Sequence, residues 1–158
     1  MSALFAAPAA PDVRFRMLRD QDVDGVAAIE SDVYAFPWTA GNFRDSLQAG
    51  YRCWGCWNGD ELVGYAILMT AVDEAHLLNL AVSRDWQRRG IGHRLLHFIM
   101  AEARKLECVM LYLEVRPSNL AAIQLYETAG FQQLGLRRDY YPAVTGREDA
   151  LFFGLELI

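Results

Sequence analysis

The stretch Asn79–Leu95 constrains the fold of this 158-residue chain more than any other. It begins with a short apolar run that is typical of a buried strand, passes a polar break, and reaches Gly90 and Gly92 at the start of a helical pattern. Glycine lets the backbone approach a ligand closely, and the free N–H groups of a first helical turn carry partial positive charge. The stretch therefore predicts a cradle for a phosphate or pyrophosphate, to which Arg88 and Arg89 add full charges.

The residues around the two glycines do not match two better-known phosphate-binding motifs. A Walker loop requires Gly-Lys-Ser/Thr, which does not follow here. A dinucleotide fingerprint requires a third glycine and an acidic residue about 20 positions further on, and both are missing. A helix that begins with glycine by chance remains the alternative at this point.

Bulk properties narrow the class of protein. A net charge of −5 argues against a general nucleic-acid binder, and no apolar run approaches the ~20 residues of a membrane span. Met1–Pro11 lacks the basic start and apolar core of a signal peptide. Three cysteines, an odd number, indicate a reducing compartment. We therefore expect a cytoplasmic protein, monomeric or weakly dimeric, with no nucleic-acid or membrane partner.

The cysteines and histidines do not predict a metal site. Cys53 and Cys56 have the spacing of a redox motif, but they lie in a strand-like run, where residues three apart point to opposite faces. A structural role is expected for both. The three histidines do not stand at metal-ligand spacing from carboxylates or cysteines, so no metal is expected.

Hydrophobic periodicity and turn residues predict an α/β (α+β) fold in one domain, residues 13–158, after a loose tail, residues 1–12. Strands are expected at Val13–Leu18, Tyr51–Trp57, Glu61–Thr70, Glu74–Val82, Cys108–Val115, Phe131–Leu136 and Ala150–Leu157. Helices are expected from an Asp20 cap to Tyr34, from a Thr39 cap to Ala49, from the glycine turn to Leu106, and from Ser118 or Asn119 to Ala129. The order β-α-α-β-β-β-α-β-α-β-β gives a mixed sheet of six to seven strands flanked by about four helices.

Turn and crossover signals fix the pairing of the middle strands. Asn58-Gly59 predicts a hairpin between the second and third strands. A helix crosses over between the fourth and fifth strands, so these two should be parallel. Gly130 fits the position after the fourth helix, and Arg137–Asp149 is expected to be a long connection between the last two strands.

Glu114 and Tyr126 are the residues most able to carry chemistry. Glu114 stands in Cys108–Val115, a run that is otherwise apolar and is expected to be central and buried. It is either a general base or the partner of Arg116 or a helix arginine. Tyr126 follows Asn119 by seven residues and so shares its helix face. Packing alone would also explain Tyr126, and helix capping would explain Asn119.

Several segments in order resemble the GNAT acetyltransferases. The resemblance rests on Asn79–Val82, Gln87–Gly92, Leu113–Arg116, Ser118–Asn119, Ala121–Ala122, Leu125–Glu127 and Gly130–Phe131. Three further segments resemble the bacterial members that acetylate the N-terminal alanine of a ribosomal protein: Ala35–Trp38, Arg138 with Tyr140–Pro142, and Glu148–Ala150. The tail Met1–Pro11 has no counterpart in the resemblance, and Ala143–Arg147 matches loosely.

The resemblance implies acetyl-CoA as cosubstrate and assigns roles to residues. Those that would hold the cofactor are Leu80, Ala81, Val82, Gln87, Arg88, Arg89, Gly90, Ile91, Gly92, His93 and Asn119. The Val82 N–H would polarise the thioester carbonyl. Glu114 would accept the proton of the attacking amine, and Tyr126 would protonate the departing thiolate. Residues expected to line the acceptor site are Tyr34, Phe36, Trp38, Tyr140, Tyr141 and Asp149. The first three could instead be packing residues. Glu148, Asp149 and the tyrosines could receive a positively charged or aromatic second residue of the acceptor.

The expected reaction is acetyl transfer to the N-terminal α-amine of a protein, an alanine-starting small-subunit ribosomal protein. Amines attack in the neutral form, and at pH 7 deprotonation costs about 1.4 kcal/mol for an α-amine but about 4.6 kcal/mol for lysine. Two alternatives stay open. One is a GNAT enzyme that acetylates lysine side chains or a small amine; the other is a CoA-binding interaction module without catalytic activity.

Overall fold

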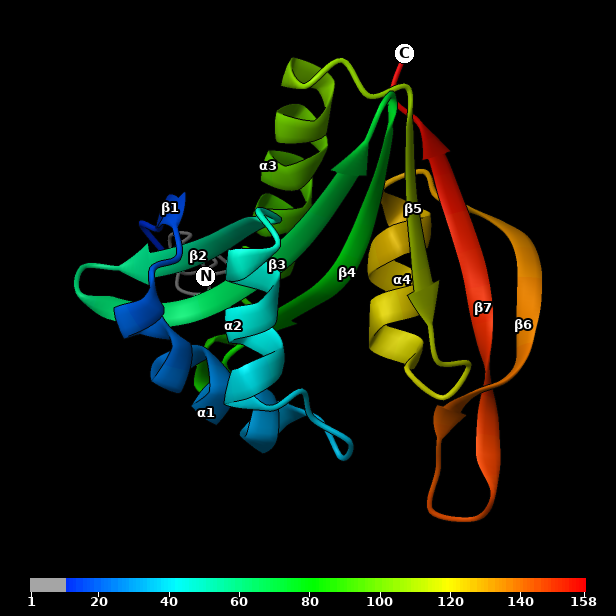
Figure 1. Cartoon of the computed structure of the whole chain (residues 1–158), viewed down its shortest axis with the longest axis horizontal. Helices are drawn as coiled ribbons and strands as arrows, with labels where there is room; N and C mark the ends of the chain where they lie inside the picture. The colour runs from blue at the N-terminus through cyan, green and yellow to red at the C-terminus, as the bar shows by residue number, and fades with distance from the viewer. Residues whose placement is uncertain (1–10) are drawn as a thin grey trace, which may run out of the picture.

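The computed structural model describes residues 11–158 and contains one seven-stranded mixed sheet in the order β1-β2-β3-β4-β5-β7-β6 (Figure 1). The strands are β1 Arg14–Met17, β2 Arg52–Asn58, β3 Glu61–Ala71, β4 Glu74–Val82, β5 Met110–Val115, β6 Gln132–Pro142 and β7 Arg147–Glu156. The helices are α1 Val23–Val33, α2 Ala40–Gln48, α3 Ile91–Lys105 and α4 Leu120–Thr128, with short 3-10 turns η2 Asp20–Asp22 and η3 Arg84–Trp86. The predicted element order is confirmed, as is the parallel pairing of β4 with β5.

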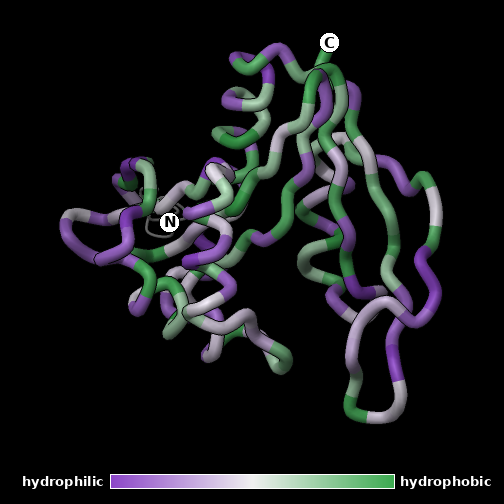
Figure 2. Tube along the Cα trace, in the orientation of Figure 1, coloured by the Kyte–Doolittle hydropathy of each residue, from purple (hydrophilic) through white to green (hydrophobic). Residues whose placement is uncertain are grey.

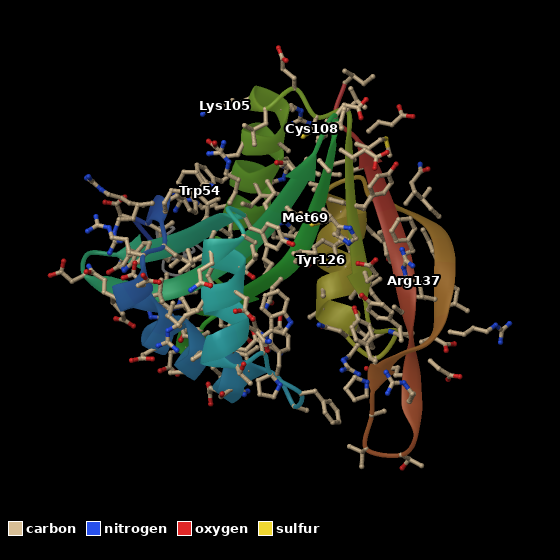
Figure 3. All side chains as sticks on the ribbon, in the orientation of Figure 1. Trp54, Met69, Lys105, Cys108, Tyr126 and Arg137 are labelled. Atoms are coloured by element: carbon tan, nitrogen blue, oxygen red, sulfur yellow. The ribbon has the colours of Figure 1, made fainter. Side chains whose placement is uncertain are left out.

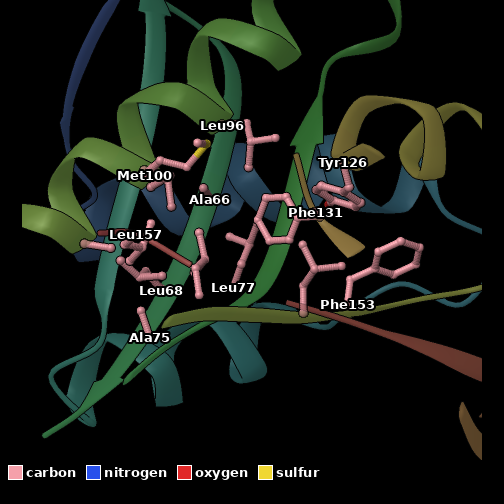
Figure 4. Packing of buried hydrophobic residues seen from close by; sticks show 14 of the residues in the cluster. Ala66, Leu68, Ala75, Leu77, Leu96, Met100, Tyr126, Phe131, Phe153 and Leu157 are labelled. Carbon is pink, nitrogen blue, oxygen red and sulfur yellow. The ribbon is translucent and has the colours of Figure 1, made fainter. Parts of the chain in front are cut away.

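Helices cover both faces of the sheet, with α1 and α2 on one side and α3 and α4 on the other (Figure 1). The core on the α3 side gathers Leu95, Leu96 and Ile99 against β3, β4, β5 and β7 and extends to Tyr126 of α4 (Figure 4). The core on the α1 side packs β2 and β3 against α1 and α2. Among the described residues, no helix is long and apolar enough to span a membrane.

A bulge in β4 changes which of its side chains face each side of the sheet. Leu77 pairs with Leu68 and Asn79 pairs with Ile67, so Leu78 is an extra residue in the ladder. Residues four apart on a regular strand share a face, yet Leu77 lies in the core under α3 and Ala81 in the core under α1 and α2. The bulge therefore bends β4 at the point where it leaves β5.

Cys53 and Cys56 lie on opposite faces of the sheet, as their spacing in a strand predicts. Both are buried free thiols, and burial raises the pKa of each to about 11. A thiol with a raised pKa is a poor nucleophile at neutral pH. Their environment is that of packed side chains, which agrees with the structural role expected for them.

Local capping agrees with prediction at three helix ends and differs at a fourth. Thr39 caps α2 by accepting from Asn42 N–H at 3.1 Å, Asn119 caps α4, and Gly130 follows α4 with φ +105°. Asp20, in contrast, does not cap α1. It lies inside the 3-10 turn, and Asp22 is the residue before α1.

The segment Arg137–Asp149, expected as a connection, is largely strand. β6 runs to Pro142 and β7 begins at Arg147, so only a short turn joins them. Most side chains of β6 are exposed, and the strand carries hydrophilic stretches (Figure 2). It is held by pairing with β7 rather than by burial, and for this reason hydrophobic periodicity does not detect its second half.

Candidate active site

The site begins where β4 and β5 separate. The two strands pair only from Glu74 with Met110 to Leu77 with Leu113. Beyond this point they diverge, and α4 follows directly after β5 on the α3 side of the sheet (Figure 1). The bulge at Leu78 turns β4 away, so its last residues have a strand partner on the β3 side only.

The unpaired edge of β4 presents main-chain groups to this gap. Ser83 N–H donates to Val63 O, so the odd-numbered residues at the end of β4 bond to β3 and the even-numbered ones face the gap. The carbonyl oxygens of Leu80 and Val82 accept from the Tyr34 hydroxyl at 2.5 Å and from Gln87 Nε2 at 3.0 Å. The N–H groups of the same two residues point to the same side. They suit an extended ligand that carries amide groups.

The start of α3 has the geometry of an anion site. Gly90 precedes the helix with φ +80°, and no side chain caps the first turn. Residues other than glycine rarely adopt a positive φ of this size. The N–H groups of Ile91 and Gly92 belong to that first turn, and Arg88 and Arg89 precede it. Gln87 was predicted to be part of the cradle, but it lies four residues before the helix begins. Its side chain donates to Val82 O at the end of β4.

Glu114 lies on the half-open face of β5 and not in a buried strand. Leu111, Leu113 and Val115 are buried, whereas the residues between them are partly exposed, so the expectation of a strand buried throughout is wrong. The Glu114 side chain is 9% exposed, with His76 Nε2 at 2.5 Å from one carboxylate oxygen and Arg137 Nε at 3.2 Å from the other.

The ion-pair alternative for Glu114 named Arg116 or a helix arginine, and neither is the partner. Arg137 (labelled in Figure 3) comes from β6, and its guanidinium lies over the Phe152 ring of β7 and reaches Glu114 of β5. Two contacts therefore fix the orientation of the Glu114 carboxylate. The residues that make them, His76 and Arg137, were not among the candidates from sequence.

Three tyrosines gather beside the gap. Tyr126 is 7% exposed on α4, and burial raises the pKa of its phenol above the ordinary value. Burial also raises the pKa of Tyr34 and Tyr141, and each lies close enough to Tyr126 for its charge to contribute. Glu114 further raises the pKa of Tyr141. The phenols are thus protonated at neutral pH, and Tyr141 lies near the Glu114 carboxylate.

Arg116 joins two loops that flank the site. Its guanidinium lies 5.1 Å from the Phe36 ring and 4.3 Å from the Tyr141 ring, and it donates to Pro142 O at 2.7 Å. Arg116 thus connects two residues predicted to line the acceptor site, Phe36 from the α1–α2 loop and Tyr141 from β6. Tyr140 packs edge-on against Tyr141 and is 47% exposed.

The two acidic residues expected to receive a cationic acceptor side chain already have partners. Glu148 pairs with Arg116 at 3.2 Å and accepts from Ser118 N–H, and these contacts lower its pKa. Asp149 accepts from Asp139 N–H at 2.8 Å. Both carboxylates fix the hairpin of β6 and β7, and this reduces their availability to a substrate.

Glu30 is a site residue that sequence reasoning missed. It is 2% exposed on α1 and accepts from Tyr65 hydroxyl at 2.6 Å, Asn79 Nδ2 at 2.8 Å and Trp38 N–H at 3.0 Å. One carboxylate thus connects β3 and β4 to residues 34–38 between α1 and α2, which we call the aromatic loop. Its position four residues after Val26, on the apolar face of α1, was the available signal.

Asn119 and His93, the last two predicted cofactor residues, lie at helix starts. The Asn119 side-chain oxygen caps α4 by accepting from Ala122 N–H at 3.2 Å, and its amide group remains as a donor. His93 is exposed in the first turn of α3. Among residues 11–158, no group of three or more His, Cys, Asp and Glu side chains could hold a metal ion.

An unpaired strand edge beside an anion cradle fits a ligand with an amide-bearing arm and a pyrophosphate. This combination, next to a carboxylate and a phenol, defines the class of CoA-dependent acyltransferases. The chain belongs to the acetyltransferase (GNAT) family, whose model matches residues 23–131. Acetyl-CoA is the cosubstrate of this family, and the main-chain edge and helix start fit its arm and pyrophosphate.

Individual relatives are similar over nearly the whole chain. The [ribosomal protein bS18]-alanine N-acetyltransferase of Escherichia coli K12 is 39% identical over 140 residues, covering 89% of this chain and 95% of that protein. The enzyme of the same name from Haemophilus ducreyi is 34% identical, covering 87% and 96%. The crystal structure of the ribosomal-protein-S18-alanine N-acetyltransferase from Escherichia coli superposes with a TM-score of 0.87 at 37% identity, over 92% and 94% of the chains.

Replacing both Arg88 and Arg89 with alanine is expected to weaken CoA binding about tenfold. Exposed charge pairs contribute roughly 0.2–1 kcal/mol each, so two of them approach the 1.4 kcal/mol that corresponds to tenfold. Calorimetric titration with CoA at two salt concentrations measures the change, which should shrink at high salt. Arg44→Ala on α2, where the side chain is 46% exposed and pairs with Asp24, is the matched control. An unchanged Kd in the double variant would remove the arginines from the cradle.

Proposed function

We propose that this enzyme transfers the acetyl group of acetyl-CoA to the N-terminal α-amine of a protein, and that its acceptor is the alanine-starting ribosomal protein bS18. The observation that carries the proposal is the position of Glu114, held by two partners on the half-open face where β4 and β5 separate, near Tyr141, which in turn lies close to Tyr126. The names of the relatives supply the acceptor. The proposal places the enzyme in the cytoplasm, where ribosomal proteins are made.

In the proposed reaction, Glu114 takes a proton from the acceptor ammonium, directly or through a water molecule. An α-amine has a reference pKa of about 8, so its deprotonation at pH 7 costs only about 1.4 kcal/mol. The thioester is already activated, and the neutral amine attacks it without a covalent enzyme intermediate. The Val82 N–H, on the free edge of β4, is placed to stabilise the developing oxyanion.

Tyr126 completes the proposed reaction by protonating the sulfur of CoA as the tetrahedral intermediate collapses. Its phenol is protonated throughout the neutral range, because burial raises its pKa. A thiolate in the same dry surroundings is a stronger base than in water, and this assists the transfer. The acceptor segment lies between the aromatic loop that contains Phe36 and the β6–β7 hairpin that contains Tyr141.

Peptide pairs distinguish the possible acceptors. One peptide begins with a free alanine and contains an internal lysine, and its partner has the same sequence with the α-amine blocked. Intact-mass and fragment analysis after incubation with acetyl-CoA shows which nitrogen is modified. We expect modification of the free α-amine and little reaction of the blocked peptide. Equal reaction of both would assign the enzyme to lysine acetylation, and no reaction with CoA binding intact would favour a non-catalytic module.

A further inference from the structure

We propose that His76 is a second proton-carrying residue of the active site, which takes the acceptor's proton from Glu114 and releases it to water. This inference rests on the proposed function and adds to it a route for the proton. None of the roles implied by the family resemblance includes His76. It follows from the contact between the two side chains and from their unequal exposure.

The sheet holds His76 and Glu114 on the same face. His76 of β4 pairs in parallel register with Tyr112 of β5, and Glu114 stands two residues further along that strand. Across β3, the residue opposite His76 is Met69, which does not titrate. The His76 Nε2 lies 2.5 Å from Glu114 Oε2, within hydrogen-bond reach, so a proton can be transferred directly between the two atoms.

A proton relay to solvent requires that the second residue is more exposed to water than the first, and this is the case here. Glu114 is 9% exposed and His76 is 23% exposed. Arg137 occupies the second carboxylate oxygen at 3.2 Å. A proton taken up by Glu114 therefore has limited direct access to water, whereas the imidazole reaches water on its far side.

Proton balance shows why an exit is needed. The reactants are an ammonium group and a thioester, and the products are an amide, a thiol and one free proton. Of the two protons that leave the nitrogen, one corresponds to that gained by the sulfur and the other must reach solvent. Glu114 accepts a proton, His76 takes it at Nε2, and a proton leaves from Nδ1. This returns Glu114 to the carboxylate form, and exchange of protons with water restores the Nδ1–H tautomer of His76 before the next turnover.

The groups that face His76 come from β5 and β6. Glu114 and Arg137 are its charged neighbours through the shared carboxylate, and Tyr112 and Tyr141 are the titratable groups beside them on β5 and β6. A relay requires a side chain that both accepts and donates a proton, and the two ring nitrogens of histidine provide this.

His76→Gln tests the relay, because glutamine can still donate a hydrogen bond to Glu114 but cannot carry a proton. We expect kcat/KM for an alanine-starting peptide to fall about tenfold near pH 7, less than the 10²–10⁴ typical of losing a general base itself. The deficit should narrow as the pH approaches the amine pKa of about 8. His97→Gln, at an exposed position of α3, is the matched control. An unchanged rate and pH profile in His76→Gln would overturn the inference.

An NMR titration of His76 separates this inference from the proposed function. If the wild-type enzyme acetylates no α-amine, the proposed function fails, and the coupling of the pair is still measurable. We expect the His76 ring signals to titrate at a lower pH in Glu114→Gln than in the wild type, because the carboxylate that favours the imidazolium is gone. Identical titration curves in the two proteins would show that no proton is shared and would overturn the relay.

Discussion

Replacing Glu114 with glutamine is expected to lower kcat/KM for an alanine-starting peptide by about 10²–10³-fold at pH 7. Glutamine has nearly the same size and can still contact His76 and Arg137, so the loss reports the missing proton acceptor rather than a cavity. The loss should diminish as the pH rises through the α-amine pKa of about 8, because the neutral amine then needs no base. Initial rates between about pH 6 and pH 9 measure both effects.

Two comparisons make the Glu114 result specific. CoA affinity should be unchanged in Glu114→Gln, because we propose that the main-chain edge of β4 and the start of α3 hold the cofactor. Tyr126→Phe should lower kcat but keep the wild-type dependence on amine ionisation, because its proposed role is to protonate the thiolate and not to deprotonate the amine. Wild-type turnover in Glu114→Gln, with folding intact, would show that another group deprotonates the amine.

Much of this fold is predictable because its inner strands bury one or both faces. The boundaries of β4 agree with prediction at both ends, and the parallel crossover to β5 follows from the helix between them. The turn at Gly90 was predictable for a different reason. A positive φ before an uncapped helix start requires glycine, so the sequence itself records the local geometry.

Long-range pairing explains what the sequence did not reveal. Arg137 and His76 meet Glu114 only because β6, β4 and β5 come together in one sheet, and no spacing along the chain predicts such a contact. The second half of β6 is exposed on both faces and is broken by a register shift between Arg137 and Tyr141. Its alternation of apolar and polar residues is lost, and its residues resemble a loop.

Glu30→Ala is expected to destabilise the enzyme by about 3 kcal/mol or more. The substitution removes the acceptor for three donors, namely Tyr65 hydroxyl, Asn79 Nδ2 and Trp38 N–H. An unsatisfied buried donor costs about 1–3 kcal/mol. At about 2–4 °C per kcal/mol for a chain of this size, the melting temperature should fall by roughly 6–12 °C. Thermal unfolding measures the shift, and Asp24→Ala at an exposed position of the same helix is the control.

Substitution of Glu30 should also weaken binding of the acceptor peptide more than binding of CoA. Glu30 binds the main chain of the aromatic loop at Trp38 N–H, whereas it contacts β4 through the Asn79 side chain, and pairing with β3 also holds the β4 edge that suits CoA. In Glu30→Gln, one amide oxygen still accepts while its NH₂ group faces existing donors, so we expect a smaller loss of stability and a rise in peptide KM with CoA affinity little changed. If KM stayed at the wild-type value while stability fell, Glu30 would support the fold without positioning the loop. A rise in KM would instead show that the buried carboxylate couples the packing of α1 to the acceptor site.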